Sequence, residues 1–216
     1  MRIPPEAVLT LLHTCTYGTL ATHSVQVSGF PYATVLPYVL DSQHRPLLCI
    51  SALAEHTKNV LADPRVSLSV VQPGAEDVQD AARLTLVATI ERVAPDPALL
   101  ARYLRYQPKT EELLALDFMF FRLQPRRVRY IGGVGRMGWL SDQEWAELPA
   151  LPADVEESFL REASAVIGGR VRILSADCFG IDYETRGQRH RQCFPDAPLT
   201  VQRFAVAAPR IVAELS

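Results

Sequence analysis

The order of short apolar runs and turns restricts this chain to a small set of folds. From residue 18 to residue 133 strand-like runs alternate with turn residues such as Ser28-Gly29, and few helices interrupt them. The expected strands are residues 18–24, 31–41, 46–51, 65–71, 83–93, 117–125 and 127–133. Because continuous alternation of strands and helices is missing, a doubly wound parallel sheet is disfavoured. The pattern predicts a mainly β (α+β) fold built on an antiparallel barrel, closed or split, because closure removes free strand edges.

A polar, proline-bearing stretch at residues 141–154 separates this region from a second one and is typical of a linker. Beyond it we expect an amphipathic helix, a three-stranded meander and a closing helix over residues 197–215, with Asp196 as a possible cap. The predicted organisation is a barrel domain at 1–140, a linker at 141–154 and a small α-β-β-β-α domain at 155–216.

Composition excludes several classes of function. The chain has 216 residues and a formal net charge of −2, so no basic field would hold nucleic acid or an anionic membrane by charge alone. No apolar stretch approaches the roughly 20 residues that span a bilayer. The four cysteines are scattered without a CxxC pair, which argues against zinc, and Cys49 is expected in the core. A reduced, cytoplasmic protein is predicted. No Ser-His-Asp order supports a hydrolase, and no catalytic residue is identified.

One turn concentrates polar side chains between two expected strands. After Ser51 a short helix is expected over residues 54–62, and His56, Thr57, Lys58 and Asn59 share its first turn. A helix N-terminus presents unpaired N–H groups and partial positive charge, so it favours an anion. We expect a cradle for a phosphate or a propionate made by Ser51, His56, Thr57 and Lys58. The alternative is an ordinary helix cap with Lys58 and Asn59 turned to water.

The segment GGVGRMGW at residues 132–139 is the second candidate. Its glycines allow close approach of the backbone to a ligand, Arg136 can pair with a phosphate or propionate, and Trp139 offers a flat apolar face. The alternative is a flexible loop whose Trp139 packs on the barrel. His13 and His23 are given no role. His190 is expected to face solvent between two arginines.

Taken in order, GTLAT, GFPYATVLPY, LLCISALAEHTKNVLADPRVSLSV, LTLVATIE and FRLQP…RYIGGVGRMGWL resemble the pyridoxamine 5′-phosphate oxidase-like FMN-binding split barrels. The likeness covers roughly residues 8–140 and is closer to the HugZ-type haem-utilisation subgroup, which often carries a similar small C-terminal domain. It implies a homodimer of six-stranded split barrels with a flat cofactor in each of two interface clefts. It also implies that Thr34, Val35 and Leu36 lie along the flavin ring and that Ser51 through Lys58 hold the phosphate.

One departure from the family pattern bears on the cofactor. The oxidase pattern has an Arg-Lys pair where this chain has Glu55 and His56, so phosphate binding should be weaker, whereas the haem-type subgroup commonly has the same His-Thr pattern. Three hypotheses follow: an FMN-binding, flavin-dependent oxidoreductase-like protein; a haem-binding or haem-degrading protein; and a non-enzymatic small-molecule binding protein. The flavin hypothesis is placed ahead of haem because no iron ligand is obvious inside the barrel. In the haem hypothesis Arg136 and His56 meet propionates and a histidine ligates the iron. HugZ-type proteins can use a histidine of the C-terminal region for this purpose, but His190 is expected to face solvent, and no metal ligand is assigned.

Overall fold

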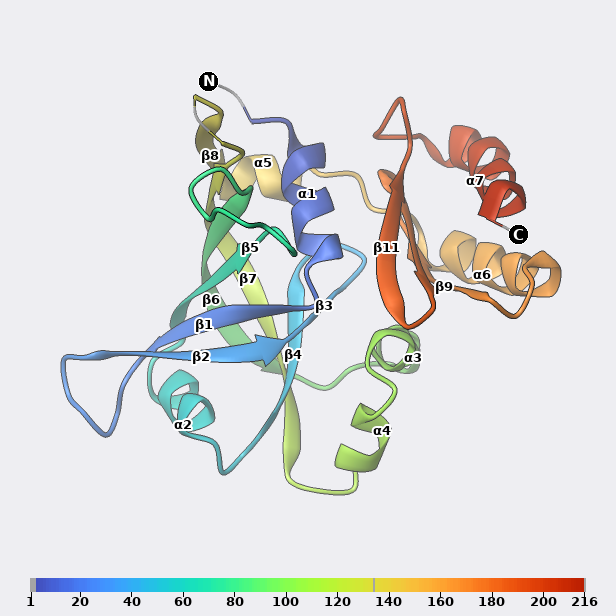
Figure 1. Ribbon diagram of the computed structural model, residues 1–216. Helices are drawn as coiled ribbons and strands as arrows, with labels where there is room; N and C mark the ends of the chain where they lie inside the picture. The colour runs from blue at the N-terminus through green and yellow to red at the C-terminus, as the bar shows by residue number, and fades with distance from the viewer. Residues whose placement is uncertain (1–2, 134, 216) are drawn as a thin grey trace. The chain divides into compact units, whose positions relative to one another are not determined.

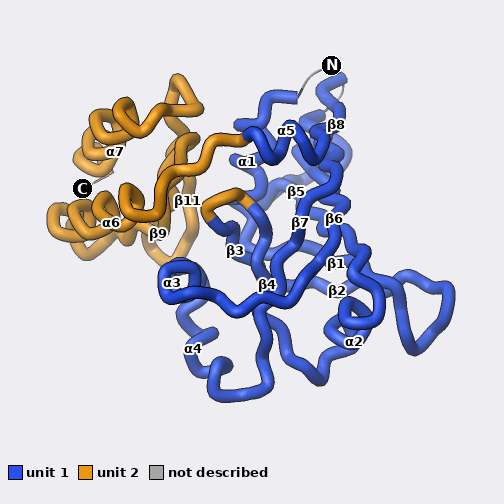
Figure 2. Tube along the Cα trace, turned by 180° about the vertical axis from the view of Figure 1, so that it is seen from behind, with its two compact units in different colours: residues 1–41, 45–147 blue, residues 42–44, 148–216 orange. Residues whose placement is uncertain are grey.

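A computed structural model describes residues 3–133 and 135–215. The chain divides into two compact units, each described by itself (Figure 2). Unit 1 comprises residues 1–41 and 45–147, and unit 2 comprises residues 42–44 and 148–216. The described part of the chain has no helix with the length and hydropathy needed to cross a membrane.

Unit 1 is built on one antiparallel sheet, which has eight strands among the described residues (Figure 1). Its order is β2-β1-β5-β6-β7-β4-β3, and β8 also pairs with β7. The strands are β1 (Tyr17–His23), β2 (Pro31–Pro37), β3 (Val39–Leu40), β4 (Pro46–Ser51), β5 (Arg65–Val71), β6 (Arg83–Val93), β7 (Phe118–Ile131) and β8 (Met137–Ser141). The helices are α1 (Pro5–Thr14), α2 (Glu55–Ala62), α3 (Pro97–Tyr106), α4 (Thr110–Leu113) and α5 (Asp142–Ala146). The predicted antiparallel split barrel with flanking helices is confirmed.

Two local predictions about the strands of unit 1 were wrong. The expected break at Pro125 is absent, because β7 runs continuously and accommodates the proline at a register shift opposite Val87 and Ala88. The glycine-rich segment also contributes a strand, β8, which pairs with the far half of β7. In the expected linker, residues Asp142–Ala146 form α5, whose N-terminus has a capping box between Ser141 and Glu144.

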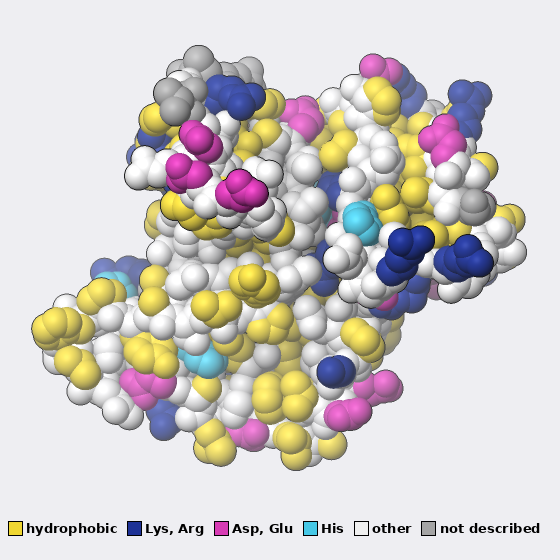
Figure 3. Space-filling view, in the orientation of Figure 1, with side chains coloured by type: hydrophobic (Ala, Val, Ile, Leu, Met, Phe, Trp, Pro, Cys, Tyr) yellow, Lys and Arg dark blue, Asp and Glu magenta, His cyan; other side chains and the backbone are white. Residues whose placement is uncertain are grey.

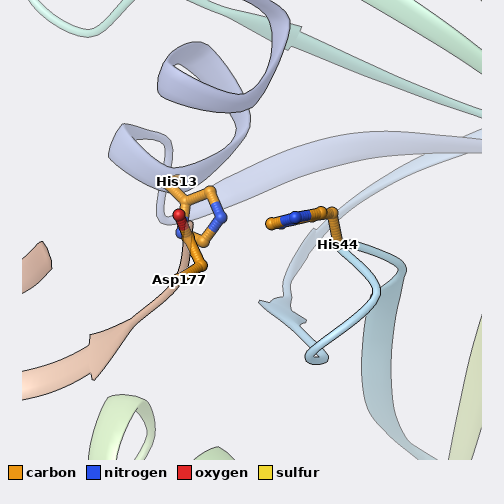
Figure 4. Close-up of side chains that lie close together, drawn as sticks. All are labelled: His13, His44 and Asp177. Atoms are coloured by element: carbon orange, nitrogen blue, oxygen red, sulfur yellow. The ribbon is translucent and has the colours of Figure 1, made fainter. Parts of the chain in front are cut away.

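Alternating burial along the strands forms the core of unit 1. Leu20, Leu68 and Leu86 face each other across β1, β5 and β6, and each is 0% exposed. Burying one such side chain stabilises the fold by roughly 1.5–3 kcal/mol. Cys49 is buried as expected, and its burial raises the thiol pKa to about 11. Helix α1 adds Val8, Leu9 and Leu12 to the core and also buries His13 (Figure 4).

Unit 2 has the predicted α-β-β-β-α order. Its elements are α6 (Ala153–Val166), β9 (Val171–Ala176), β10 (Gly180–Thr185), β11 (Gln188–Cys193) and α7 (Val201–Leu215). The strands form an antiparallel meander, with Arg186 and Gly187 at positive φ in the β10–β11 turn. The last helix begins later than predicted, and Asp196 does not cap it. Its carboxylate accepts a hydrogen bond from Arg203 at 2.7 Å, while the Arg203 N–H lies 3.4 Å from Thr200 Oγ1.

Unit 2 buries charge as well as aromatic rings. Phe204 makes edge contacts with Phe159 and Phe194 between helix and sheet. Arg191 is fully buried and donates to Asp177 and Asp182 at 2.7–2.9 Å. The buried His44 lies at positive φ and its ring contacts Phe179 edge-on at 5.6 Å; Figure 4 shows His44 together with Asp177. A buried guanidinium with two carboxylates fixes one arrangement of the meander, since every alternative leaves a charge unpaired.

Candidate cofactor site

A helix follows β4 where the sequence predicted one. Ala54 is the N-cap residue, without a side-chain cap, and α2 begins at Glu55. The Ser51 hydroxyl donates to Asp117 Oδ2 at 3.0 Å and accepts from the Leu53 N–H at 3.2 Å. Ser51 therefore ends the strand through a closed set of local hydrogen bonds, and a ligand that recruits its hydroxyl has to compete with Asp117.

Thr57 is used inside the protein. It is 0% exposed, and its hydroxyl donates to the Ser51 carbonyl at 2.6 Å. Since a hydroxyl has one proton, this bond leaves Thr57 no proton to donate to a ligand. Its observed role is to fasten the first turn of α2 to the end of β4.

Asn59 likewise holds the helix in place. Its amide donates to Thr22 Oγ1 at 3.0 Å and accepts from the Val25 N–H at 2.9 Å, and the residue is 0% exposed. The interpretation of Asn59 as a solvated residue was therefore wrong, whereas Lys58 is exposed as that interpretation required. The two neighbours differ because a helix turns by about 100° per residue, which places one toward β1 and the other toward water.

His56 and Lys58 are the residues of this turn that remain open to a ligand. His56 is half-buried, and desolvation lowers its pKa below the usual 6.5. A neutral imidazole presents one N–H donor and one acceptor nitrogen. Within residues 55–59, Lys58 is thus the one full positive charge at neutral pH, next to the carboxylate of Glu55.

The strand β2 is an edge strand that pairs with β1 alone among the described residues. Its side chains alternate, so Val35 points to the opposite face from Thr34 and Leu36. Val35 is 61% exposed, while Thr34 and Leu36 are half-buried. The free edge of β2 offers backbone N–H and C=O groups to a flat ligand, as the resemblance implies for this strand.

Arg136 and Trp139 lie at the other end of the sheet. Arg136 is exposed in the β7–β8 turn, where Gly133 and Gly135 adopt positive φ that only glycine tolerates readily. Trp139 on β8 is 44% exposed. Within the segment of residues 132–139, Val134 alone lies outside the described residues.

Two further arginines, which were not among the residues predicted from the sequence, contact Trp139. The guanidinium carbon of Arg127 lies 4.4 Å from the centroid of the Trp139 ring, and that of Arg129 lies 5.3 Å away. Both distances are within the range of cation–π contacts. Their spacing in the sequence could have indicated a shared face, because residues two apart on a strand point to the same side of the sheet.

A small apolar cavity lies beside the β7–β8 turn. Its volume is about 160 Å³, and its lining residues are Ile3, Pro4, Ala7, Tyr130, Gly132, Arg136 and Met137. Ligand pockets typically measure about 300–1,000 Å³, so this cavity is too small for a flavin or a porphyrin. The ring of such a cofactor would have to lie outside it.

The two halves of the predicted site stand at opposite ends of one sheet face. Direct cross-strand partners share a face, and the registers connect one row of residues, which defines the outer face: Val35, Thr19, Ser69, Thr85, Arg129 and Trp139. Five strand spacings of about 4.8 Å separate β2 from β8, or roughly 24 Å along the sheet. Figure 1 shows these two strands well apart in unit 1. A cofactor shared by both strands is therefore more readily placed between two copies than within one.

His190, the histidine of the C-terminal region that was expected to face solvent, lies on β11 in unit 2. It is half-buried, and its ring stacks on Tyr183 at 5.3 Å. The expectation that it faces solvent is therefore only half met, since one face of the ring is covered.

Comparison with known proteins identifies the family of the first unit. The family model described as pyridoxamine 5′-phosphate oxidase matches residues 4–132. The chain is 33% identical over 135 residues to a protein of Arabidopsis thaliana named non-canonical heme oxygenase HOZ, chloroplastic, and spans 41% of its length. It is 31% identical over 126 residues to the heme oxygenase HutZ of Vibrio cholerae and spans 71% of that protein. These matches cover 61% and 55% of this chain.

Similarity to a solved structure extends over both units. A heme binding protein from Mycobacterium smegmatis is 26% identical, with a TM-score of 0.64, and the alignment covers 100% of this chain and 98% of that one. The resemblance to the split-barrel family and its haem-utilisation subgroup is thereby confirmed.

Proposed function

Because the chain belongs to the pyridoxamine 5′-phosphate oxidase family, we propose that it binds a planar, anionic cofactor at the interface of a homodimer, and that this cofactor is haem. The names of the two curated relatives, both heme oxygenases, support a haem-degrading reaction of that class. FMN is the second candidate, favoured by the description of the family itself.

The charge of the turn at the start of α2 carries the choice of haem over FMN. A phosphate monoester bears about −1.5 to −2 charges at neutral pH and is stabilised by several cations. This turn offers Lys58, a His56 whose pKa is lowered by burial, and the opposing carboxylate of Glu55. Such a turn suits a singly charged carboxylate better than a phosphate, and the propionates of haem are carboxylates. The flavin preference drawn from the sequence is revised for this reason.

A second copy of the chain is required to complete the site. In a two-fold dimer the same surface patch serves both copies, so β2 of one copy can face β8 of the other. Exposed apolar side chains support such a contact: Tyr17, Val25, Val27, Phe30 and Val35 are each at least 53% exposed. Figure 3 shows hydrophobic side chains at the surface over β1, β2 and the loop that joins them. Apolar surface of this kind is typical of an interaction site.

The residues have separate roles in the proposed complex. Bound haem supplies the iron that activates oxygen. Val35 and Trp139 give apolar contact to the macrocycle, and the free edge of β2 supplies backbone groups. His56 and Lys58 on one copy and Arg136 on the other are the donors for the carboxylates.

Titration of the purified full chain with haem and, separately, with FMN tests the proposal. We expect a Soret band that saturates at one haem per chain and weaker binding of FMN. Binding of FMN alone overturns the choice of haem, and binding of neither overturns the proposed function.

Light scattering tests the dimer. The wild-type chain should have the mass of a dimer, and Val35→Glu should give a monomer that no longer binds haem, because it places a charge on the proposed apolar contact. Leu61→Glu is the matched control, since Leu61 on α2 is 59% exposed but does not lie on the outer face. A monomeric wild-type chain that still binds haem would contradict the shared site.

A further inference from the structure

We propose that Arg127, Arg129 and Trp139 form a binding platform for the two carboxylates of the planar ligand, contributed by one copy to the cofactor held at β2 and α2 of the other. We call these three residues the Arg–Trp–Arg platform. This inference rests on the proposed function and assigns a role to two arginines that the family motifs do not include.

The register of β7 and β8 places the platform on one face. Arg129 pairs directly with Trp139, and Arg127 pairs with Ser141 two residues further along β8. Both guanidinium groups lie over the indole ring, at 4.4 Å and 5.3 Å from its centroid. The ring therefore positions both cations, and it remains 44% exposed itself.

The charges of the platform are not neutralised by carboxylates among the described residues. Arg122 on the same strand differs, because its Nε lies 3.0 Å from Asp41. A guanidinium that stacks on an aromatic ring keeps its N–H edge available for a bidentate bond to a carboxylate. Two like charges on one face also repel each other, and a bound anion relieves that repulsion.

The spacing of the two arginines indicates the class of anion. Residues two apart on a strand are separated by roughly 6.6 Å at the backbone. This separation suits two distinct carboxylates, each with its own guanidinium, and a porphyrin carries two propionates. Because both guanidinium groups lie over the same ring, a single phosphate shared by the two is the competing assignment, and the comparison of haem with FMN distinguishes the two anions.

The surface between the platform and β2 is suited to a second copy. On the row from Arg129 to Val35 the intervening side chains are Thr85, Ser69 and Thr19, which are all small and half-buried. Small side chains along this row permit close approach of another copy to the face between Arg129 and Val35. In the proposed dimer the platform of one copy faces the cofactor held at β2 and α2 of the other, where Lys58 is the one full cation of residues 55–59.

Ligands with and without anionic groups test the platform. The full chain and the double variant Arg127→Gln/Arg129→Gln are titrated with haem and with haem dimethyl ester, following absorbance and the quenching of tryptophan fluorescence. We expect the double variant to bind haem about 10- to 100-fold more weakly, as for loss of a charged hydrogen bond, and the ester as well as the wild-type chain does. Arg126→Gln is the matched control, because Arg126 is exposed on the same strand but lies 3.4 Å from Thr89 Oγ1.

Each other outcome has a definite meaning. If the double variant loses affinity equally for haem and for its ester, the arginines contribute to packing and the platform is overturned. Unchanged affinity for both ligands also overturns the platform. Loss of FMN binding with retention of riboflavin binding assigns the platform to a phosphate and overturns the two-carboxylate assignment. A wild-type chain that binds neither haem nor FMN overturns the proposed function and the platform with it. If the wild-type chain binds haem, the proposed function stands, and the double variant then tests the platform alone.

Discussion

Arginines on antiparallel strands serve two different purposes in the two units. In unit 2, Arg191 is fully buried and its guanidinium donates to two aspartates at 2.7–2.9 Å. In unit 1, the exposed Arg127 and the half-buried Arg129 lie over the ring of Trp139, with no carboxylate partner among the described residues. The residue type and the strand context are the same, so the neighbouring carboxylates decide the role. A guanidinium that is paired with buried carboxylates of its own chain stabilises the fold. A guanidinium that stacks on an aromatic ring, without a carboxylate, can bind a ligand.

Replacing Arg191 should produce the largest loss of stability. Arg191→Ala removes the buried guanidinium that Asp177 and Asp182 share, and breaking a buried ion pair typically costs about 3–5 kcal/mol in the free energy of unfolding. Urea unfolding followed by circular dichroism measures this loss. The double variant Arg127→Gln/Arg129→Gln should change the unfolding free energy by less than about 0.5 kcal/mol, as for surface substitutions. Equal losses in the two variants would remove the distinction between a structural and a binding arginine.

A second control keeps the comparison within unit 2. Arg172 forms an exposed ion pair with Glu184 at 3.2 Å across β9 and β10. Exposed pairs contribute about 0–1 kcal/mol because solvent screens them. Arg172→Ala should therefore destabilise the chain far less than Arg191→Ala does, although both remove one arginine from the same meander.

The turn at α2 repeats the distinction on a smaller scale. Asn59 is buried and bridges Thr22 and the Val25 N–H, while Lys58 beside it is exposed. Asn59→Ala leaves buried polar groups unsatisfied, which costs about 1–3 kcal/mol each, so urea unfolding should show a clear loss. Lys58→Ala should leave stability within about 0.5 kcal/mol and weaken haem binding instead. Loss of binding without loss of stability in Asn59→Ala would reverse the assignment of the two residues.

Sequence patterns predicted the architecture because the strands bury alternate residues. The repeated alternation in β1, β5 and β6 is a local signal, and so is the turn at Arg186-Gly187. The continuity of β7 was not predicted, because a proline is a strong local break signal and only pairing with β6 accommodates it. The strand β8 was missed for a related reason, since its glycine-rich surroundings indicate a loop until β7 is present to pair with it.

Only those features of the site that depend on local sequence could be predicted. The start of α2 and the exposure of Lys58 follow from local sequence. The inward orientation of Thr57 and Asn59 does not, because it depends on β4 and β1, which are brought there by the tertiary fold. Arg127 and Arg129 occupy alternate positions of a predicted strand, so their shared face could be inferred. Their contact with Trp139 could not, because it requires the register of β8.

Protonation of His56 should produce the smallest effect, and it distinguishes burial from ion pairing in the α2 turn. Desolvation lowers the pKa of His56 in the folded chain below 6.5, so the unfolded chain binds more protons in the window below that pH. Stability should therefore be fully present above about pH 6.5 and decrease as the pH falls toward the folded pKa. His56→Gln should reduce this slope in urea unfolding measured between pH 5 and pH 7.5. Repeating the series at high salt separates the causes, because screening weakens charge pairs but leaves desolvation largely intact. If the variant and the wild-type chain have identical slopes, the pKa of His56 is the same in the folded and the unfolded chain, and burial then does not reduce the positive charge of this turn.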